Sequence, residues 1–410
     1  MVTTALEAAV KSHDVGTTHD FLAALAFLLW SNESACVSES GFESLISDFR
    51  RERLVQLLHP ALMNELVASK VLLSSHMGLS FRYPYFYYYY LARWISHKAG
   101  SDSSDELLRS FVENIHTEMA ANVVIFVAHL GNEKLVLNLL IPAAKDLFKG
   151  ADECKLAERA GLASKYLDGT REVVFSSSNA AEVSDHHHEE QDKVPADQIS
   201  ESLEDAFKYM TAIRMIQVLG QVMRSRAGSI SASDKTLITR TAISLSRRLM
   251  SVLYDAAELS AEVLLENASE LFDTEIKRDS KEARGFANRL VAAVVGGISK
   301  GLVSRAADVF GTRDLAPLID ALEEEAKAQG DLDNELIMLC ARVVAEQRYP
   351  QERIESLLRR LPDHDILSKA ALAHSVARTF FLQPPPHAVR DAACARLGIQ
   401  IRGIPVRQPG

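Results

Sequence analysis

The chain has 410 residues, of which 47% are hydrophobic and 24% charged, and its 45 basic and 55 acidic side chains give a formal net charge of −10. An acidic chain repels nucleic-acid phosphates over most of its surface, so we expect no nucleic-acid partner. No apolar run reaches the roughly 18 residues needed to span a bilayer, and the N-terminus lacks the pattern of a signal peptide, so we expect a cytoplasmic protein that does not bind membranes.

The first 98 residues show a pattern of three helices, a hairpin and a closing helix. Apolar residues at helical spacing predict helices over 18–30, 41–52 and 61–69. Two short β-prone runs, 71–75 and 79–83, flank a His-Met-Gly connection and predict a β-hairpin. A helix then follows to about residue 98. This order of elements is typical of a winged-helix domain, which we place at residues 1–98.

Aromatic residues are concentrated between positions 81 and 94, where the hairpin meets the closing helix. Tyr and Trp bring a large apolar area with a polar tip that needs a partner, so such a run belongs between packed layers or against another chain. We expect the inward side of this helix to be ordinary core. The sequence does not indicate which tyrosines are exposed.

This segment resembles the winged-helix module that follows the nucleotide-binding domain in STAND-type signalling ATPases, the NACHT and NB-ARC relatives. The family pattern has an aromatic, any residue and a His, and then a helix with a Glu, two aromatics and an Ala. Phe81, Tyr89, Tyr90 and Ala92 fit the pattern, whereas Tyr83 fills the His position and Tyr88 the Glu position.

In the family, that His approaches the β-phosphate of ADP and helps to hold the resting state. The resemblance therefore implies that Arg82 and Tyr83 contact the nucleotide of a partner NTPase domain. A Tyr hydroxyl can still donate a hydrogen bond in place of the His.

Segments 114–129 and 216–229 are similar to the helical continuation of prokaryotic STAND proteins of the antiviral-defence kind. The resemblance implies a regulatory module that holds the resting state, recognises a protein trigger through helices at 199–410, and forms a homo-oligomer on activation. Because no Gly-x-x-x-x-Gly-Lys-Ser/Thr loop is present, we expect no cofactor and no enzymatic activity in this chain alone. ATP or ADP would lie on an NTPase domain in cis or in trans, and this chain would be the C-terminal part of the machine.

The segment 171–198 is polar, acidic and aperiodic, and we expect a flexible linker there. It contains the tract His186 to His188, which we interpret as solvated residues without preformed metal-binding geometry. The four cysteines are scattered along the chain, which disfavours a zinc cluster or a disulfide scaffold: Cys36, Cys154, Cys340 and Cys394. We expect each of them to be buried and to act as a small hydrophobic side chain. No metal site is predicted.

The remaining sequence predicts helices, first as an extension over 99–170 and then as a domain over 199–410. Helices of this domain are expected from 200 or 202 to 223, from about 234 toward 265, and at 281–307, 314–329, 332–347, 352–361 and 366–381. They are separated by Gly311, Gly330, Pro350, Pro362 and the run from Pro384 to Pro386. Short helices joined by tight turns indicate an irregular bundle or a solenoid-like stack without a fixed period. The fold class is therefore mainly α.

Two other functions stay open. The chain could be a free-standing adaptor or scaffold whose aromatic helix is simply core. It could also bind nucleic acid, since winged helices often enter the major groove. The basic residues that would serve this role are more simply explained as solvated or internally paired: Arg50, Arg51 and Arg53 in the first domain, and Arg224, Arg226, Arg240, Arg247 and Arg248 in the second.

Overall fold

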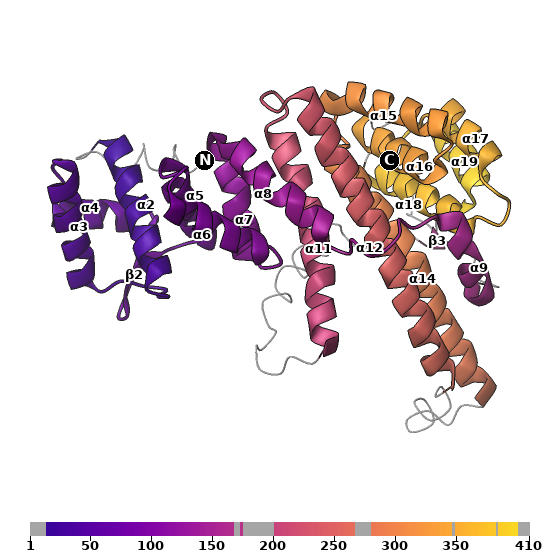
Figure 1. Ribbon diagram of the computed structural model, residues 1–410, viewed down its shortest axis with the longest axis horizontal. Helices are drawn as coiled ribbons and strands as arrows, with labels where there is room; N and C mark the ends of the chain where they lie inside the picture. The colour runs from indigo at the N-terminus through magenta and orange to yellow at the C-terminus, as the bar shows by residue number, and fades with distance from the viewer. Residues whose placement is uncertain are drawn as a thin grey trace, which may run out of the picture. The chain divides into compact units, whose positions relative to one another are not determined.

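The computed structural model describes residues 14–167, 173–174, 201–266, 280–346, 349–382 and 384–400 (Figure 1). The chain forms two compact units, unit 1 at Met1–Ala143 and unit 2 at Ala144–Gly410. The domain boundaries expected at residues 98, 170 and 198 stay predictions. Apart from residues 173–174, the expected linker 171–198 with its His186–His188 tract lies outside the described residues.

The described residues are mainly helical, with a small antiparallel hairpin near the N-terminus, as the sequence predicts. Unit 1 contains, in chain order, α2 (Val15–Ser31), α3 (Glu39–Arg53), α4 (His59–Ala68), β1 (Leu72–Ser75), β2 (Gly78–Phe81), α5 (Pro84–His97), α6 (Asp102–Glu113), α7 (Glu118–Val127), the π-helical turn η1 (Ala128–Asn132) and most of α8 (Glu133–Asp146). Local side-chain chemistry determines where some of these helices begin. The Asp14 carboxylate caps α2 by accepting the Thr17 N–H at 2.7 Å, and Pro84 occupies the first turn of α5.

The hairpin of unit 1 gains a third short partner. Strands β1 and β2 pair antiparallel with Leu72 opposite Phe81 and Ser75 opposite Gly78. On the other edge of β2, the Val37 and Leu79 backbones exchange two hydrogen bonds of 2.8 Å. Val37 lies between α2 and α3 in the chain. The hairpin that follows α4 therefore pairs with a residue that precedes α3.

The core of unit 1 forms where α2 packs against α5. Phe21 and Leu25 of α2 and Tyr90 of α5 are fully or almost fully buried, and the Tyr90 hydroxyl lies 3.0 Å from Nδ1 of the buried His19. Phe27 stacks on Trp94 with ring centroids 3.6 Å apart and 3° between the planes. The inward side of the aromatic run thus packs against α2, the first helix that the structure describes in this unit.

Unit 2 is built mainly from helices of 10 to 35 residues, the longest of which, α12 and α14, pack against each other (Figure 1). Its elements after α8 are α9 (Leu156–Leu167), β3 (Val173–Val174), α11 (Glu201–Ser225), α12 (Ala232–Glu266), α14 (Ser280–Phe310), η2 (Arg313–Leu315), α15 (Ala316–Gln329), α16 (Leu332–Glu346), α17 (Gln351–Arg360), α18 (Ile366–Leu382), α19 (His387–Leu397) and β4 (Ile399–Gln400). Helix α14 contacts α9, α11, α12, α16 and α18, which makes it the central helix of the unit.

Several expectations for this half need correction. Helix α19 and the two-residue parallel pairing of β3 with β4 were not predicted. The expectation of four buried cysteines is wrong for Cys36 and Cys394, which are partly exposed, whereas Cys154 and Cys340 are buried; all four are free thiols. The winged-helix and solenoid-like assignments stay predictions.

Two described helical stretches, Glu118–Asp146 and Ala287–Phe310, are long and apolar enough to cross a membrane, contrary to our expectation that no apolar run has that length. The first turns at Gly131, where φ is 99°, and contains Pro142. The second lies within α14, the central helix of unit 2. Because core helices of soluble proteins pass the same test, these two stretches are weak evidence of membrane insertion.

Candidate functional site

Arg82 and Tyr83 lie at the corner where β2 ends and α5 begins. The Arg82 N–H donates to the Val71 carbonyl at 3.0 Å and so extends the hairpin ladder by one bond. Tyr83 precedes Pro84, and the proline ring disfavours helical backbone for the residue before it. Tyr83 is accordingly extended, with φ −125° and ψ 138°, and serves as the N-cap residue of α5. The backbone therefore holds both side chains at a fixed corner of the hairpin.

The two side chains contact each other and remain accessible. Arg82 Nε lies 3.4 Å from the Tyr83 hydroxyl, and the guanidinium carbon lies 5.6 Å from the centroid of the tyrosine ring. Tyr83 is 42% exposed and stacks on Tyr85, which is 41% exposed, with centroids 5.7 Å apart. We call the surface formed by Lys70, Arg82, Tyr83 and Tyr85 the wing edge.

The wing edge is electropositive. The Arg82 hydrogen bond and charge lower the pKa of the Tyr83 hydroxyl, and the Lys70 charge adds to this effect. The first turn of α5 contains no acidic residue and its N-cap side chain makes no capping hydrogen bond, so the positive end of the helix dipole is left uncompensated there. Together these groups can donate hydrogen bonds to an anion.

The other aromatic residues of α5 have different roles. Phe86 and Tyr90 are buried, as expected for the inward side of the helix. Tyr89 meets Phe126 of α7 edge to face, with ring centroids 5.7 Å apart. Burial raises the pKa of Tyr87 to about 12. The exposed tyrosines are thus at the start of the run, which the sequence pattern alone does not reveal.

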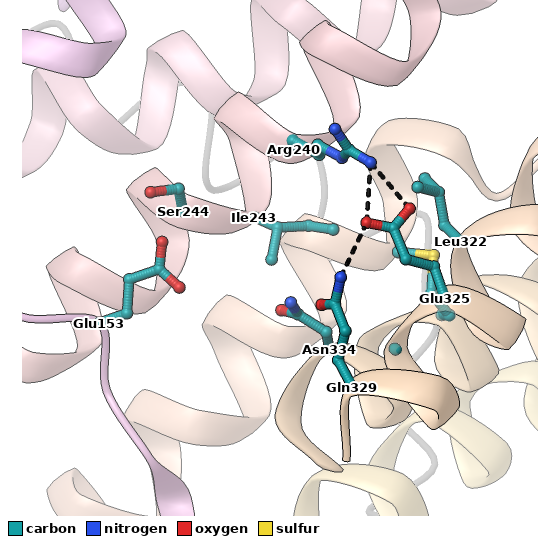
Figure 2. A pocket seen from close by; sticks show the side chains of 10 residues that line it. Glu153, Arg240, Ile243, Ser244, Leu322, Glu325, Gln329 and Asn334 are labelled. Atoms are coloured by element: carbon teal, nitrogen blue, oxygen red, sulfur yellow. Dashed lines mark hydrogen bonds and ion pairs between the residues drawn. The ribbon is translucent and has the colours of Figure 1, made fainter. Parts of the chain in front are cut away.

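Unit 2 contains a separate polar groove of about 310 Å³. Arg240 of α12 and Glu325 of α15 form a two-pronged ion pair with both N–O distances at 2.8 Å, and Gln329 donates to Glu325 at 3.2 Å (Figure 2). Figure 2 shows Glu153 and Ser244 on the opposite side of this groove. Apolar side chains, among them Ile243, Leu322 and Met338, also line this groove.

Arg247 of α12 connects three segments of unit 2 and is almost completely buried. Its guanidinium contacts Asp331 at 2.8 Å, Glu153 at 3.0 Å and the Cys154 carbonyl at 3.1 Å. The neighbouring Arg248 donates to the carbonyls of Ala144 and Lys145. Internal pairing, expected for the basic cluster, is thus confirmed for Arg240, Arg247 and Arg248, although their partners were not foreseen.

No group of three or more His, Cys, Asp or Glu side chains suited to a metal ion occurs among the residues that the structure describes. Of the first basic cluster, Arg51 pairs with Asp48 at 2.6 Å and Arg53 approaches Glu52 at 3.8 Å, both at the surface.

Residues 36–91 match the model of a family described as Novel STAND NTPase 4. The match begins next to the Val37 strand segment, covers α3, α4 and the hairpin, and ends within α5, so it includes Arg82 and Tyr83. It supports a relation to STAND-type NTPases. No curated protein and no solved structure matches the chain.

Proposed function

We propose that this chain is a regulatory and sensing module of a STAND-type NTPase, and that its wing edge contacts the nucleotide held by an NTPase domain in cis or in trans. The observation that carries the proposal is the position of Arg82 and Tyr83, which are exposed, mutually ordered and inside the matched segment. An arginine fork and a phenol hydroxyl are suitable donors for a phosphate oxygen. In this proposal the hydrolysed nucleotide and the catalytic groups belong to the NTPase domain, and this chain alone is not an enzyme.

The topology of unit 1 supports a winged-helix assignment. Helix α2, an isolated β-bridge at Val37, the helices α3 and α4, and a hairpin whose second strand pairs with Val37 are the elements of such a domain, and they follow one another here in this order. In this arrangement the hairpin is the wing. The start of α5 is then the surface that faces the nucleotide in the related proteins.

Unit 2 supplies the surface for recognition of a protein trigger in this proposal. Its long helices offer extended faces, and the Arg240–Glu325 groove offers mixed polar and apolar contacts. To move a two-state switch from 1:99 to 99:1, a trigger must favour the active state by about 5.5 kcal/mol. Such a difference requires a sizeable interface, which a helical surface can provide. Activation would proceed in the cytoplasm by homo-oligomerisation, in the antiviral setting that the resemblance implies.

The test is a charge reversal at the wing edge in the assembled protein. The double variant Arg82→Glu and Tyr83→Ala should retain ADP less well than the wild type, measured as nucleotide bound per NTPase domain after gel filtration. Arg51→Glu is the matched control, because Arg51 is an exposed arginine on α3 within the same matched segment. Equal ADP retention in both variants would contradict the proposed contact.

A further inference from the structure

A second cluster of basic residues lies in unit 2, where α14 packs against α11 and α18. We call it the cationic seam and define it by Arg214 of α11, Lys300 and Arg305 of α14, and His374 and Arg378 of α18. The carboxylate that meets it is Asp308, whose Oδ2 accepts from Arg378 at 2.8 Å. Arg224 of α11 also donates to the backbone carbonyl of Asp308. The seam thus gathers positive charge in a chain whose net charge is −10.

Two of these cations are partly buried and form no direct ion pair within the described residues. Lys300 and Arg305 are only partly exposed, and neither makes a hydrogen bond or ion pair with any described residue. Burial lowers the pKa of Lys300 and is the largest cause that lowers the pKa of Arg305. The charge of Asp308 opposes this effect on Arg305, whereas the charges of Arg214 and Arg378 add to it. A partly buried charge without a partner is costly for a folded protein. Such a cost is compensated when an anion occupies the site.

The surface of α14 beside these cations is bare. Gly297, Gly301 and Arg305 are spaced four residues apart, so they lie on one stripe of α14. A Cβ at either glycine would meet no atom within 4 Å. On the adjacent stripe, Ser304 follows Lys300 by one turn, and its hydroxyl is buried without a hydrogen-bond partner. Open backbone, two unpaired cations and an orphan hydroxyl therefore share one side of the helix.

We propose that the cationic seam binds a compact phosphate-bearing anion, which Arg305 and Arg378 hold through their guanidinium groups while Lys300 adds a point charge. Guanidinium forks match the oxygens of a phosphate group, and an ammonium group contributes charge without directional demands. Burial lowers the pKa of His374, and the nearby charges of Lys300 and Arg378 lower it further. This site is separate from the wing edge and does not depend on the proposed function.

The test is calorimetric titration of the full chain with pyrophosphate. We expect one binding event, at least about tenfold weaker in the double variant Lys300→Gln and Arg305→Gln, because each lost charged hydrogen bond accounts for roughly a tenfold change in Kd. The matched control Lys235→Gln and Arg289→Gln removes the same charges from α12 and α14 and should bind within about twofold of wild type. Absence of binding to the wild type, or equal loss in both double variants, would overturn the proposal.

Two further measurements guard against misfolding and identify the ligand. Arg378→Gln alters an exposed side chain at the edge of the seam, so weaker pyrophosphate binding in this correctly folded variant supports the site and unchanged binding contradicts it. Without ligand, the double seam variant should melt a few degrees higher than wild type, since it loses two unpaired charges. Equal affinity for pyrophosphate and ADP would assign recognition to the phosphates, and tighter ADP binding would add a nucleoside contact.

Discussion

Val37 and Gly78 approach each other so closely that a Cβ at position 78 would lie 2.3 Å from the Val37 carbonyl oxygen. Gly78 also has a φ of +123°, which side chains with a Cβ rarely adopt. This contact joins Val37, which precedes α3, to Gly78, the first residue of β2. It therefore fixes where the strand that leads to Arg82 and Tyr83 begins.

Gly78→Ala should destabilise unit 1 strongly. The substitution adds backbone strain of about 1–3 kcal/mol and a clash with backbone that cannot move away. Gly100→Ala is the matched control, because Gly100 has a φ of +87° but a Cβ there would meet no atom within 4 Å, so it reports strain alone. Urea unfolding of both variants measures the difference. Equal loss of stability would show that the Val37 contact contributes nothing.

Tyr90→Phe should lower the unfolding free energy of unit 1 by about 1–3 kcal/mol, the usual cost of leaving a buried polar atom unpaired. The atom concerned is His19 Nδ1, which lies 3.0 Å from the Tyr90 hydroxyl in the contact between α2 and α5. Tyr85→Phe changes an exposed tyrosine on the same helix and should be nearly neutral. Chemical denaturation of the two variants tests this pair directly. A neutral Tyr90→Phe would contradict the assigned hydrogen bond.

His19 should make the stability of unit 1 depend on pH. Burial lowers the pKa of His19, the Arg93 charge lowers it further, and the Asp20 charge opposes both effects. The unfolded chain takes up a proton near the ordinary pKa of about 6.5, whereas the folded state resists it, so stability should fall as the pH is lowered from about 7 to 5.

Substitution of His19 by Gln should flatten this decline, since Gln does not titrate. Burial lowers the pKa of His97 as well, so part of the slope should remain. His76→Gln, at the exposed hairpin tip, serves as the control. Unfolding curves recorded at several pH values measure the slope, and an unchanged slope in the His19 variant would contradict the prediction.

Arg247→Ala should destabilise unit 2 by about 3–5 kcal/mol, because it removes one partner from a buried ion pair. Its carboxylate partners Asp331 and Glu153 come from different segments, so the loss loosens their packing together. Arg240→Ala breaks the more exposed ion pair with Glu325 and should cost no more than about 1 kcal/mol. Thermal unfolding compares the two variants. A similar cost for both would show that the burial of Arg247 has no energetic consequence.

The sequence predicts most of the fold because its helices are marked locally. Gly330 ends α15 with a φ of 70°, and Pro84 begins α5. Helix α19 was not predicted because the run of prolines from Pro384 reads as the end of the helical region, whereas Pro386 in fact provides the N-cap position of a further helix.

The position of the candidate site could be predicted from the sequence, but the exposure of its aromatic side chains could not. The hairpin pattern and the X-Pro step locate Arg82 and Tyr83 at a strand-to-helix corner. Which aromatics face solvent depends on how α2 covers α5, which is a tertiary property. The Arg247 cluster had no local signal, since Arg247 and Asp331 are 84 positions apart in the sequence.

The most direct test of the central claim is purification of the tagged protein from its own cell, followed by measurement of intact masses and bound nucleotide. We expect an NTPase domain carrying ADP, either within a larger polypeptide or as a co-purifying chain. Recovery of a lone 45.2 kDa chain without nucleotide would contradict the claim and indicate an independent helical interaction protein.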